Sequence, residues 1–68
     1  MNNFKFGDKV VVTIEGFYKG TIGYVTEYEN NGDQGNLYRV QLVGADGVSE
    51  TFWDVQLELI EPAFKWSN

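Results

Sequence analysis

The chain has 68 residues, with ten acidic and five basic side chains and a net charge of −5. This length accommodates one domain with a small hydrophobic core. Cysteine and histidine are absent, which excludes disulfides, ordinary zinc sites and the usual base–nucleophile pairs of hydrolases. We therefore expect a single domain that is not an enzyme and that needs no metal or cofactor.

The acidic balance also narrows the possible partners. Binding to phosphate backbones or anionic lipids depends on clustered Lys and Arg, so the net charge disfavours nucleic acid. It is typical of a soluble domain, or of an acidic face that meets a basic partner. The sequence contains no membrane-spanning apolar run and no signal-peptide pattern, so a membrane partner is not expected. We expect a cytoplasmic location; the lack of cysteine fits it and is equally compatible with other compartments.

The first predicted strand, Lys9 to Glu15, is rich in valine and isoleucine. The two-residue period of a strand places Val10, Val12 and Ile14 on one face, which we expect to be buried. The following segment, Gly16 to Gly20, is bounded by glycines and predicts a short loop.

The second predicted strand, Thr21 to Glu29, contains one glycine, Gly23. A lone glycine in a strand is typical of a bulge or a sharp bend, which a small barrel needs at its corners. If Val25 points inward, strict alternation turns three neighbours outward: Tyr24, Thr26 and Tyr28.

The polar segment Glu29 to Asn36 predicts an exposed loop. Its asparagine and aspartate oxygens are of the kind that binds calcium. The segment lacks the ligand spacing of an EF-hand, including the closing glutamate, so a plain turn-rich loop is favoured.

The segments Leu37 to Val43 and Val48 to Trp53 predict a β-hairpin. A three-residue loop of residues 45–47, with glycine in the left-handed region, is favoured because it keeps the apolar residues on one face. This register places Leu42 opposite Glu50, Val40 opposite Phe52, and Arg39 opposite Trp53. A two-residue turn would instead pair Val40 with Trp53.

The end of the chain predicts one more strand. Residues 54–57 are too few for an α-helix and are compatible with a single 3₁₀ turn. Leu57 to Glu61 follows as the last strand, which Pro62 ends. Five short strands with glycine corners predict a small closed all-β barrel over residues 1–61, with residues 62–68 as a tail.

Four aromatic residues lie near the ends of the chain. We expect Phe4 and Phe6 to lie in the core or to cap the barrel. Phe64 and Trp66 are unusual in a tail; they either fold back over an open end of the barrel or dock to a partner or a second copy.

The glycine and valine spacing of the first half closely resembles the KOW motif of SH3-like barrels, found in certain ribosomal proteins and transcription elongation factors. The matching residues are Gly7, Asp8, Val10, Val12, Gly16, Gly20, Gly23 and Val25. A later set is similar to the remaining strands of such barrels: Tyr38, Arg39, Val40, Leu42, Phe52 and residues 57–60. The resemblance implies a five-stranded SH3-like barrel over residues 4–61.

The resemblance also implies a contact region. In the family, the loop between the first two strands often contacts the partner, and Lys19 lies where members often carry a basic residue. The chain departs from the RNA-binding members because its net charge is negative and it has no basic cluster. The barrel fold hosts RNA binders, peptide binders and accessory subunits, so the resemblance leaves the function open.

The clearest functional signal is aromatic, because large rings in loops and on outward strand faces are enriched at protein interfaces. We expect a non-catalytic module that binds a protein segment or assembly partner. The predicted contact rings are Phe17, Tyr18, Tyr24, Tyr28 and Trp53, and the predicted acidic rim is Glu27, Glu29 and Glu50. The structural alternative has Phe17 capping the barrel and Trp53 stacking on Arg39 as a cation–π pair.

Three other functions stay open. Single-stranded nucleic acid could bind through Phe17, Tyr18, Lys19 and Arg39. The acidic surface could act as a decoy that inhibits a nucleic-acid-binding protein. The chain could also be a structural subunit or a homo-oligomer that docks through its tail.

Overall fold

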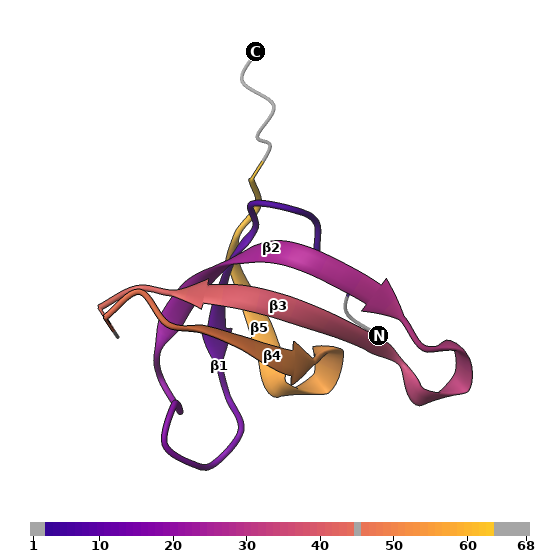
Figure 1. Ribbon diagram of the computed structural model, residues 1–68, viewed down its shortest axis with the longest axis horizontal. Helices are drawn as coiled ribbons and strands as arrows, with labels where there is room; N and C mark the ends of the chain where they lie inside the picture. Colours follow the sequence, from indigo (N-terminus) through magenta and orange to yellow (C-terminus); the bar gives the residue numbers. More distant parts are fainter. Residues whose placement is uncertain (1–2, 45, 64–68) are drawn as a thin grey trace.

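The computed structural model describes residues 3–44 and 46–63 and shows five antiparallel strands in one sheet (Figure 1). The strands are β1 (Lys9–Val12), β2 (Ile22–Asn30), β3 (Asn36–Leu42), β4 (Ser49–Trp53) and β5 (Leu57–Glu61). Two 3₁₀ turns accompany them, η1 (Gly32–Gln34) and η2 (Asp54–Gln56). The strand order β4-β3-β2-β1-β5 and the 3₁₀ turn before the last strand give the all-β, SH3-like fold that the sequence predicts. No helix in the described part of the chain has the length and apolar character needed to span a membrane.

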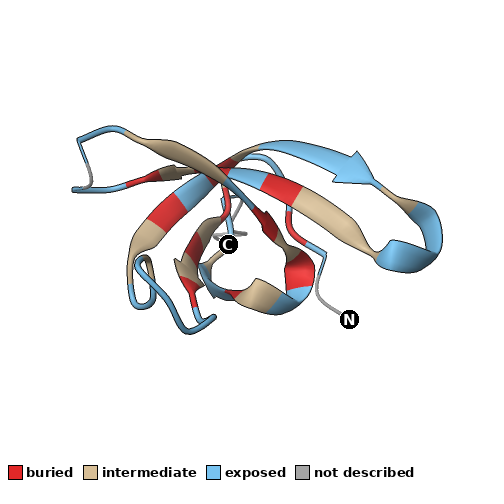
Figure 2. Cartoon of the chain, turned by 60° about the horizontal axis from the view of Figure 1, so that its bottom comes forward, coloured by how far each residue is buried: buried red, intermediate tan, exposed pale blue. Residues whose placement is uncertain are grey.

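The sheet curls around one apolar core, whose buried segments Figure 2 shows on all five strands and on the segment before β1. The core side chains come from alternate strand positions, as the two-residue period requires. They are Phe4, Val10, Val12, Val25, Tyr38, Val40, Leu42, Phe52 and Leu57. Buried apolar area of this kind is the main stabilising contribution in a chain without disulfides.

The barrel is not closed by hydrogen bonds in the way that the sequence predicted. β4 and β5 are the two ends of the strand order, and within the described residues η2 joins them where a ladder would close the barrel. The amide of Thr13 donates to the carbonyl of Gln56 at 2.9 Å, which ties η2 to the end of β1.

The first strand is shorter than predicted, and Ile14 is not in the core. β1 ends at Val12, whose carbonyl accepts a hydrogen bond from the amide of Gly20 at 2.8 Å. The chain therefore leaves the sheet before a third inward position is reached, and Ile14 is 43% exposed.

The register of the β3–β4 hairpin differs by two residues from the predicted one. Phe52 lies opposite Tyr38, and Glu50 lies opposite Val40. The amide of Leu42 donates to the carbonyl of Val48, so the loop is longer than the three residues expected. Because the shift is an even number, the predicted inward face is kept although each predicted pair is wrong.

β2 carries its irregularity at Thr26, not at Gly23 as predicted. The pairing with β3 shifts between Val25 and Glu27, which is the sign of a β-bulge. Gly23 instead marks a close approach of two backbones: a Cβ there would lie 2.4 Å from Cγ1 of Val40 and 2.7 Å from the carbonyl oxygen of Gln41.

Candidate functional site

The predicted site residues fall into three separate places on the fold. The β1–β2 loop carries Phe17, Tyr18 and Lys19. The convex face of the sheet carries Tyr24, Arg39 and Trp53. Tyr28 lies apart from both groups, near the end of β2. The structure therefore does not bring the predicted rings together on one surface.

In the β1–β2 loop, Tyr18 packs on the barrel and Phe17 packs on Tyr18. The Tyr18 ring packs edge-on against buried Phe52 with centroids 6.3 Å apart, and its hydroxyl donates to Oε2 of Glu50 at 3.1 Å. This hydrogen bond, together with burial and the negative charge of Glu50, raises the pKa of Tyr18 above its usual value. Phe17 stacks edge-on against Tyr18 at 4.9 Å and is itself 92% exposed.

Two of the predicted contact residues have partners within the fold. Lys19 forms an exposed ion pair with Glu15 in the same loop. Glu50 is half-buried on the inward face opposite Val40 and accepts the Tyr18 hydrogen bond, so it belongs to the wall of the barrel and not to an exposed rim.

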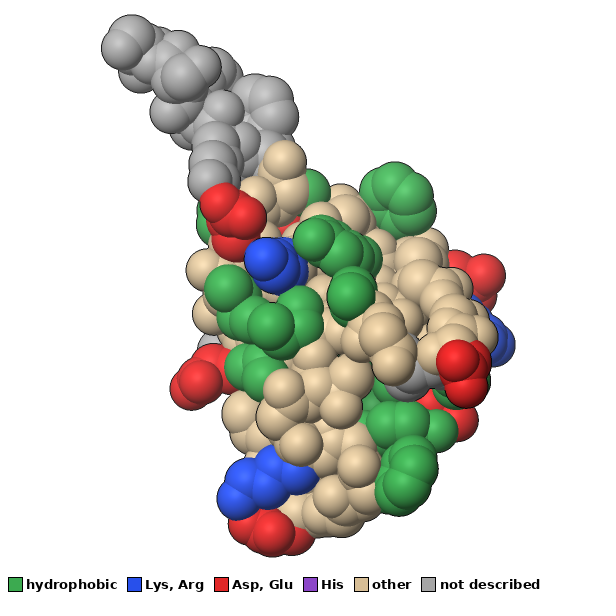
Figure 3. All heavy atoms as spheres, turned by 90° about the vertical axis from the view of Figure 1, so that its left-hand side faces the viewer, with side chains coloured by type: hydrophobic (Ala, Val, Ile, Leu, Met, Phe, Trp, Pro, Cys, Tyr) green, Lys and Arg blue, Asp and Glu red, His purple; other side chains and the backbone are tan. Residues whose placement is uncertain are grey.

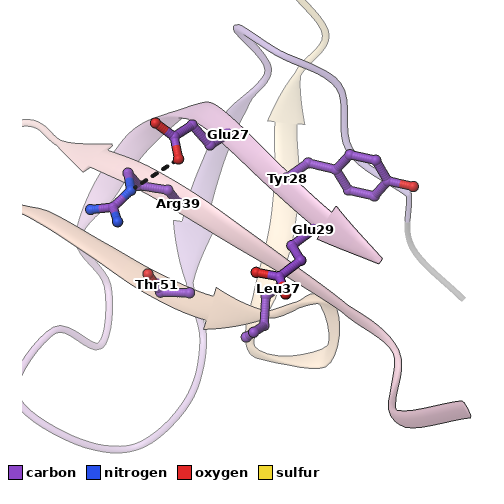
Figure 4. Close-up of a pocket in the computed structure, with 6 residues that line it drawn as sticks. All are labelled: Glu27, Tyr28, Glu29, Leu37, Arg39 and Thr51. Atoms are coloured by element: carbon purple, nitrogen blue, oxygen red, sulfur yellow. Dashed lines mark ion pairs between the residues drawn. The ribbon is translucent and has the colours of Figure 1, made fainter. Parts of the chain in front are cut away.

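On the convex face, Arg39 is paired with an acid and not with an aromatic ring (Figure 4). Its Nε lies 3.5 Å from Oε1 of Glu27, its neighbour across the β2–β3 ladder, and Thr51 is its neighbour on β4. Trp53 lies opposite Leu37 and is half-buried, so the predicted pairing of Trp53 with Arg39 is wrong. A shallow hollow of about 270 Å³ lies over this part of the face.

The bulge at Thr26 decides which way Tyr28 points. Strict alternation from Val25 would turn Tyr28 outward, but the extra residue reverses the phase of the strand after it. Tyr28 therefore shares the inward face with its partner Tyr38, and the two rings stack with centroids 5.6 Å apart. Figure 4 shows the Tyr28 side chain directed away from Glu27 and Arg39. Because it lies beyond the core, Tyr28 is still 57% exposed.

An apolar groove lies beside Tyr28, and the sequence did not predict it. It has a volume of about 430 Å³ and is lined by residues 4–6 on one side and 25–28 on the other. Phe4 is buried in its floor, where its ring meets Tyr38 edge-on at 5.1 Å. Phe6 was expected in the core or as a cap but is 77% exposed. Phe4 and Phe6 would share one face only if the backbone between them were straight. The chain turns at Phe6, so Phe4 is buried and Phe6 is exposed.

Asp8, in the turn before β1, has a structural role. The buried carboxylate of Asp8 accepts hydrogen bonds from the amides of Lys5 and Ala63, each at 2.8 Å. These bonds hold the segment that precedes β1 against the segment that follows β5. Asp8 therefore holds the backbone beside Phe6, at Lys5, in place.

Two hydrogen bonds close the asparagine-rich connection between β2 and β3 on itself. Oδ1 of Asn30 accepts from the amide of Gly32 at 2.7 Å, and the amide of Asn31 donates to the carbonyl of Gly35 at 2.9 Å. Within the described residues, no group of three or more acidic, histidine or cysteine side chains is placed to hold a metal ion.

The four basic residues that the structure describes are dispersed over different elements. Lys5 precedes β1, Lys9 is on β1, Lys19 is in the β1–β2 loop and Arg39 is on β3. Figure 3, which looks at the end of the molecule that carries the β1–β2 and β3–β4 loops, shows separate hydrophobic groups and basic side chains isolated from one another. The tail residues Phe64 and Trp66 lie outside the described residues.

Comparisons of the chain with protein-family models, curated proteins and solved structures gave no match.

Proposed function

We propose that the chain is a non-catalytic module that binds a segment of another protein. The observation that carries this proposal is the exposed Tyr28 ring, held in place by its stacking on buried Tyr38 and bordering an apolar groove. A large ring that is already ordered loses little conformational entropy on binding, which is typical of residues at the centre of protein interfaces.

The charges on the convex side of the same stretch of β2 favour a basic partner. Glu27 and Glu29 are exposed on the same stretch of β2, and Glu29 has no ion pair among the described residues. The chain as a whole carries a net charge of −5. Acidic groups around an apolar contact increase the rate of association with a basic segment and select against acidic ones.

The pairing of the cations supports a protein partner over nucleic acid. Lys19 and Arg39 were the two basic residues of the nucleic-acid hypothesis, and each has a carboxylate beside it, on Glu15 and Glu27. A phosphate would have to compete with these carboxylates, and the described residues that pair with Arg39 across the two ladders, Glu27 and Thr51, are not cations.

Selection from a displayed library of random peptides on the full chain tests the proposal. We expect enrichment of peptides that combine Lys or Arg with apolar residues and that bind in the micromolar range. Tyr28→Ala should weaken their binding about ten-fold. Tyr24→Ala removes the same ring type from the convex face of the same strand, and we expect a change of less than about two-fold.

Titration with single-stranded RNA and DNA at about 150 mM salt provides the opposing measurement. Micromolar binding to nucleic acid that falls steeply with salt, together with no enriched peptide, would overturn the proposal.

A further inference from the structure

The outer half of β2 has a strand partner on one side only. β1 pairs with Ile22, Gly23 and Tyr24, and the amide and carbonyl of Val25 bond to the turn before β1 through Asp8 and Gly7. From Thr26 to Asn30, β2 pairs with β3 alone among the described residues. Figure 1 shows β2 and β3 continuing together beyond the end of β1.

The ladder pattern identifies which backbone groups point toward this open edge. The amide of Asn31 donates to the carbonyl of Gly35, so hydrogen-bonded pairs recur at every second residue before it on β2. Glu29 and Glu27 therefore direct their amides and carbonyls to β3. Tyr28 and Asn30 direct theirs to the side where no described strand lies.

The side chains along this edge alternate in chemistry. Tyr28 lies on the inward face, beside the groove that Phe6 borders. Glu27 and Glu29 lie on the opposite, convex face. A strand placed along the edge would meet an apolar surface with one set of its side chains and two carboxylates with the other set.

We propose that the partner segment binds by adding to this edge as a sixth strand, with apolar and basic residues in alternation. The inference rests on the proposed function and specifies its ligand. The backbone groups of Tyr28 and Asn30 supply hydrogen bonds, and the groove beside Tyr28 and Phe6 takes the apolar side chains. Glu29 pairs with a basic side chain of the segment, and Glu27, which already lies beside Arg39, adds negative charge on the same face.

A second copy of the chain fits this edge poorly. If two β2 edges paired antiparallel about Tyr28, each Glu27 would lie opposite Glu29 of the other copy. Two pairs of like charges directly opposite each other destabilise such a pairing, whereas lysine or arginine at the same positions stabilises it. The charges on the edge therefore select a basic strand from another protein.

The decisive experiment changes the ligand and leaves the protein intact. The probe is a capped peptide of about seven residues in which valine and lysine alternate, titrated into the full chain and followed by amide chemical shifts. One control has the same composition with its lysines grouped at one end, and a second has glutamate in place of lysine. We expect both controls to bind at least about ten-fold more weakly.

N-methylation of alternate peptide amides tests for strand addition. Methylating the set that faces β2 should abolish binding, and methylating the other set should change it by less than about three-fold. The blocking set is the valine amides for an antiparallel strand and the lysine amides for a parallel one. An equal effect of the two sets would overturn strand addition.

Hydrogen exchange gives the matching readout on the protein. In the free chain the amides of Tyr28 and Asn30 should exchange much faster than those of Glu27 and Glu29. On peptide binding, exchange at Tyr28 and Asn30 should slow by about ten-fold or more. Glu29→Gln should weaken binding roughly two- to five-fold. Glu58→Gln, an exposed glutamate on β5, is the matched control and should leave binding unchanged.

The outcomes separate this inference from the function on which it rests. If selected peptides bind but shift the amides around Phe17 and leave those of Tyr28 and Asn30 unprotected, strand addition is wrong and protein binding stands. If protection of those two amides rises with protein concentration in the absence of peptide, the occupant is a second copy and the proposed ligand is wrong. If nucleic acid binds and no peptide does, both proposals are wrong.

Discussion

The two halves of β2 are continuous in sequence but belong to different environments. From Ile22 to Val25 the strand is bonded on both sides, and Val25 is fully buried. From Thr26 to Asn30 its strand partner in the described part of the chain is β3 alone, and most of its side chains are exposed. The bulge at Thr26 separates the two halves.

This contrast indicates where the molecule can bind a partner without losing stability. The inner half contributes Val25 to the core, and its backbone groups are bonded on both sides. The outer half is held in an extended shape by β3, and it carries an exposed ring. Among the described residues, no strand pairs with the backbone groups on its other side. A region that is ordered but incompletely bonded is suited to recognition.

The largest expected effect is at Gly23 in the inner half. Gly23→Ala would place a methyl group 2.4 Å from Cγ1 of Val40 and 2.7 Å from the carbonyl oxygen of Gln41. Since backbone would have to move, we expect the free energy of unfolding in urea to fall by about 3 kcal/mol.

Gly32→Ala, in the turn that follows the outer half of β2, is the control. Gly32 has a positive φ of 61° but no atom near its Cβ position. Only the left-handed backbone is unfavourable for alanine, at about 1 kcal/mol. Equal losses at the two glycines would contradict the close approach at Gly23.

A second pair of substitutions compares side chains of the two halves. Val25→Ala removes fully buried methyl groups and should cost about 2 kcal/mol of unfolding free energy. Tyr28→Ala removes a ring that stacks on Tyr38 with one face toward solvent, and it should cost about 1 kcal/mol. Thermal and urea unfolding measure both; a larger loss for Tyr28→Ala would place this ring in the core.

A smaller effect is expected where β3, opposite the outer half of β2, meets the segment before β1. The buried hydroxyl of Tyr38 accepts hydrogen bonds from the amide of Phe4 at 3.1 Å and from Nδ2 of Asn36 at 3.3 Å. Tyr38→Phe leaves the Phe4 amide without this acceptor and should cost about 1 kcal/mol. Faster hydrogen exchange at Phe4 should accompany the loss. Tyr24→Phe, on the exposed convex face, should be nearly neutral.

The smallest expected effect is a pH dependence at Tyr18, at the other end of the barrel. Its pKa in the folded chain is raised above 10.0 because the phenol hydrogen-bonds to Glu50. The unfolded chain therefore loses this proton first as the pH rises. The contribution of this proton to the free energy of unfolding is fully present below pH 10. It is lost as the pH rises through the folded-state pKa of Tyr18.

Urea unfolding at neutral pH and at about pH 11 measures this dependence. Tyr18→Phe should lose less stability between the two pH values than the unchanged chain does. An identical loss in both chains would show that Tyr18 does not contribute to the alkaline destabilisation.

The candidate surfaces were only partly predictable. The exposure of Phe17 followed from its position in a loop, and the ring is exposed in the structure. Tyr28 is also exposed, but it lies on the inward face after the bulge and not on the outward face as predicted. The structural role of Glu50 and the pairing of Arg39 with Glu27 did not follow, because both depend on the register between strands. Register is set by loop length and packing, which a single sequence constrains weakly.

The sequence by itself determined the alternating apolar positions, the 3₁₀ turn of residues 54–56 and the last strand, Leu57–Glu61, because these depend on local periodicity and on Pro62. Only the tertiary structure decided that β1 stops before Ile14, that Thr26 carries the bulge and that Phe6 borders a groove. The physical reason is that these features depend on which backbone groups find partners across the sheet. A one-residue insertion in a strand reverses the face of every later side chain, and residue type alone does not fix where that insertion falls.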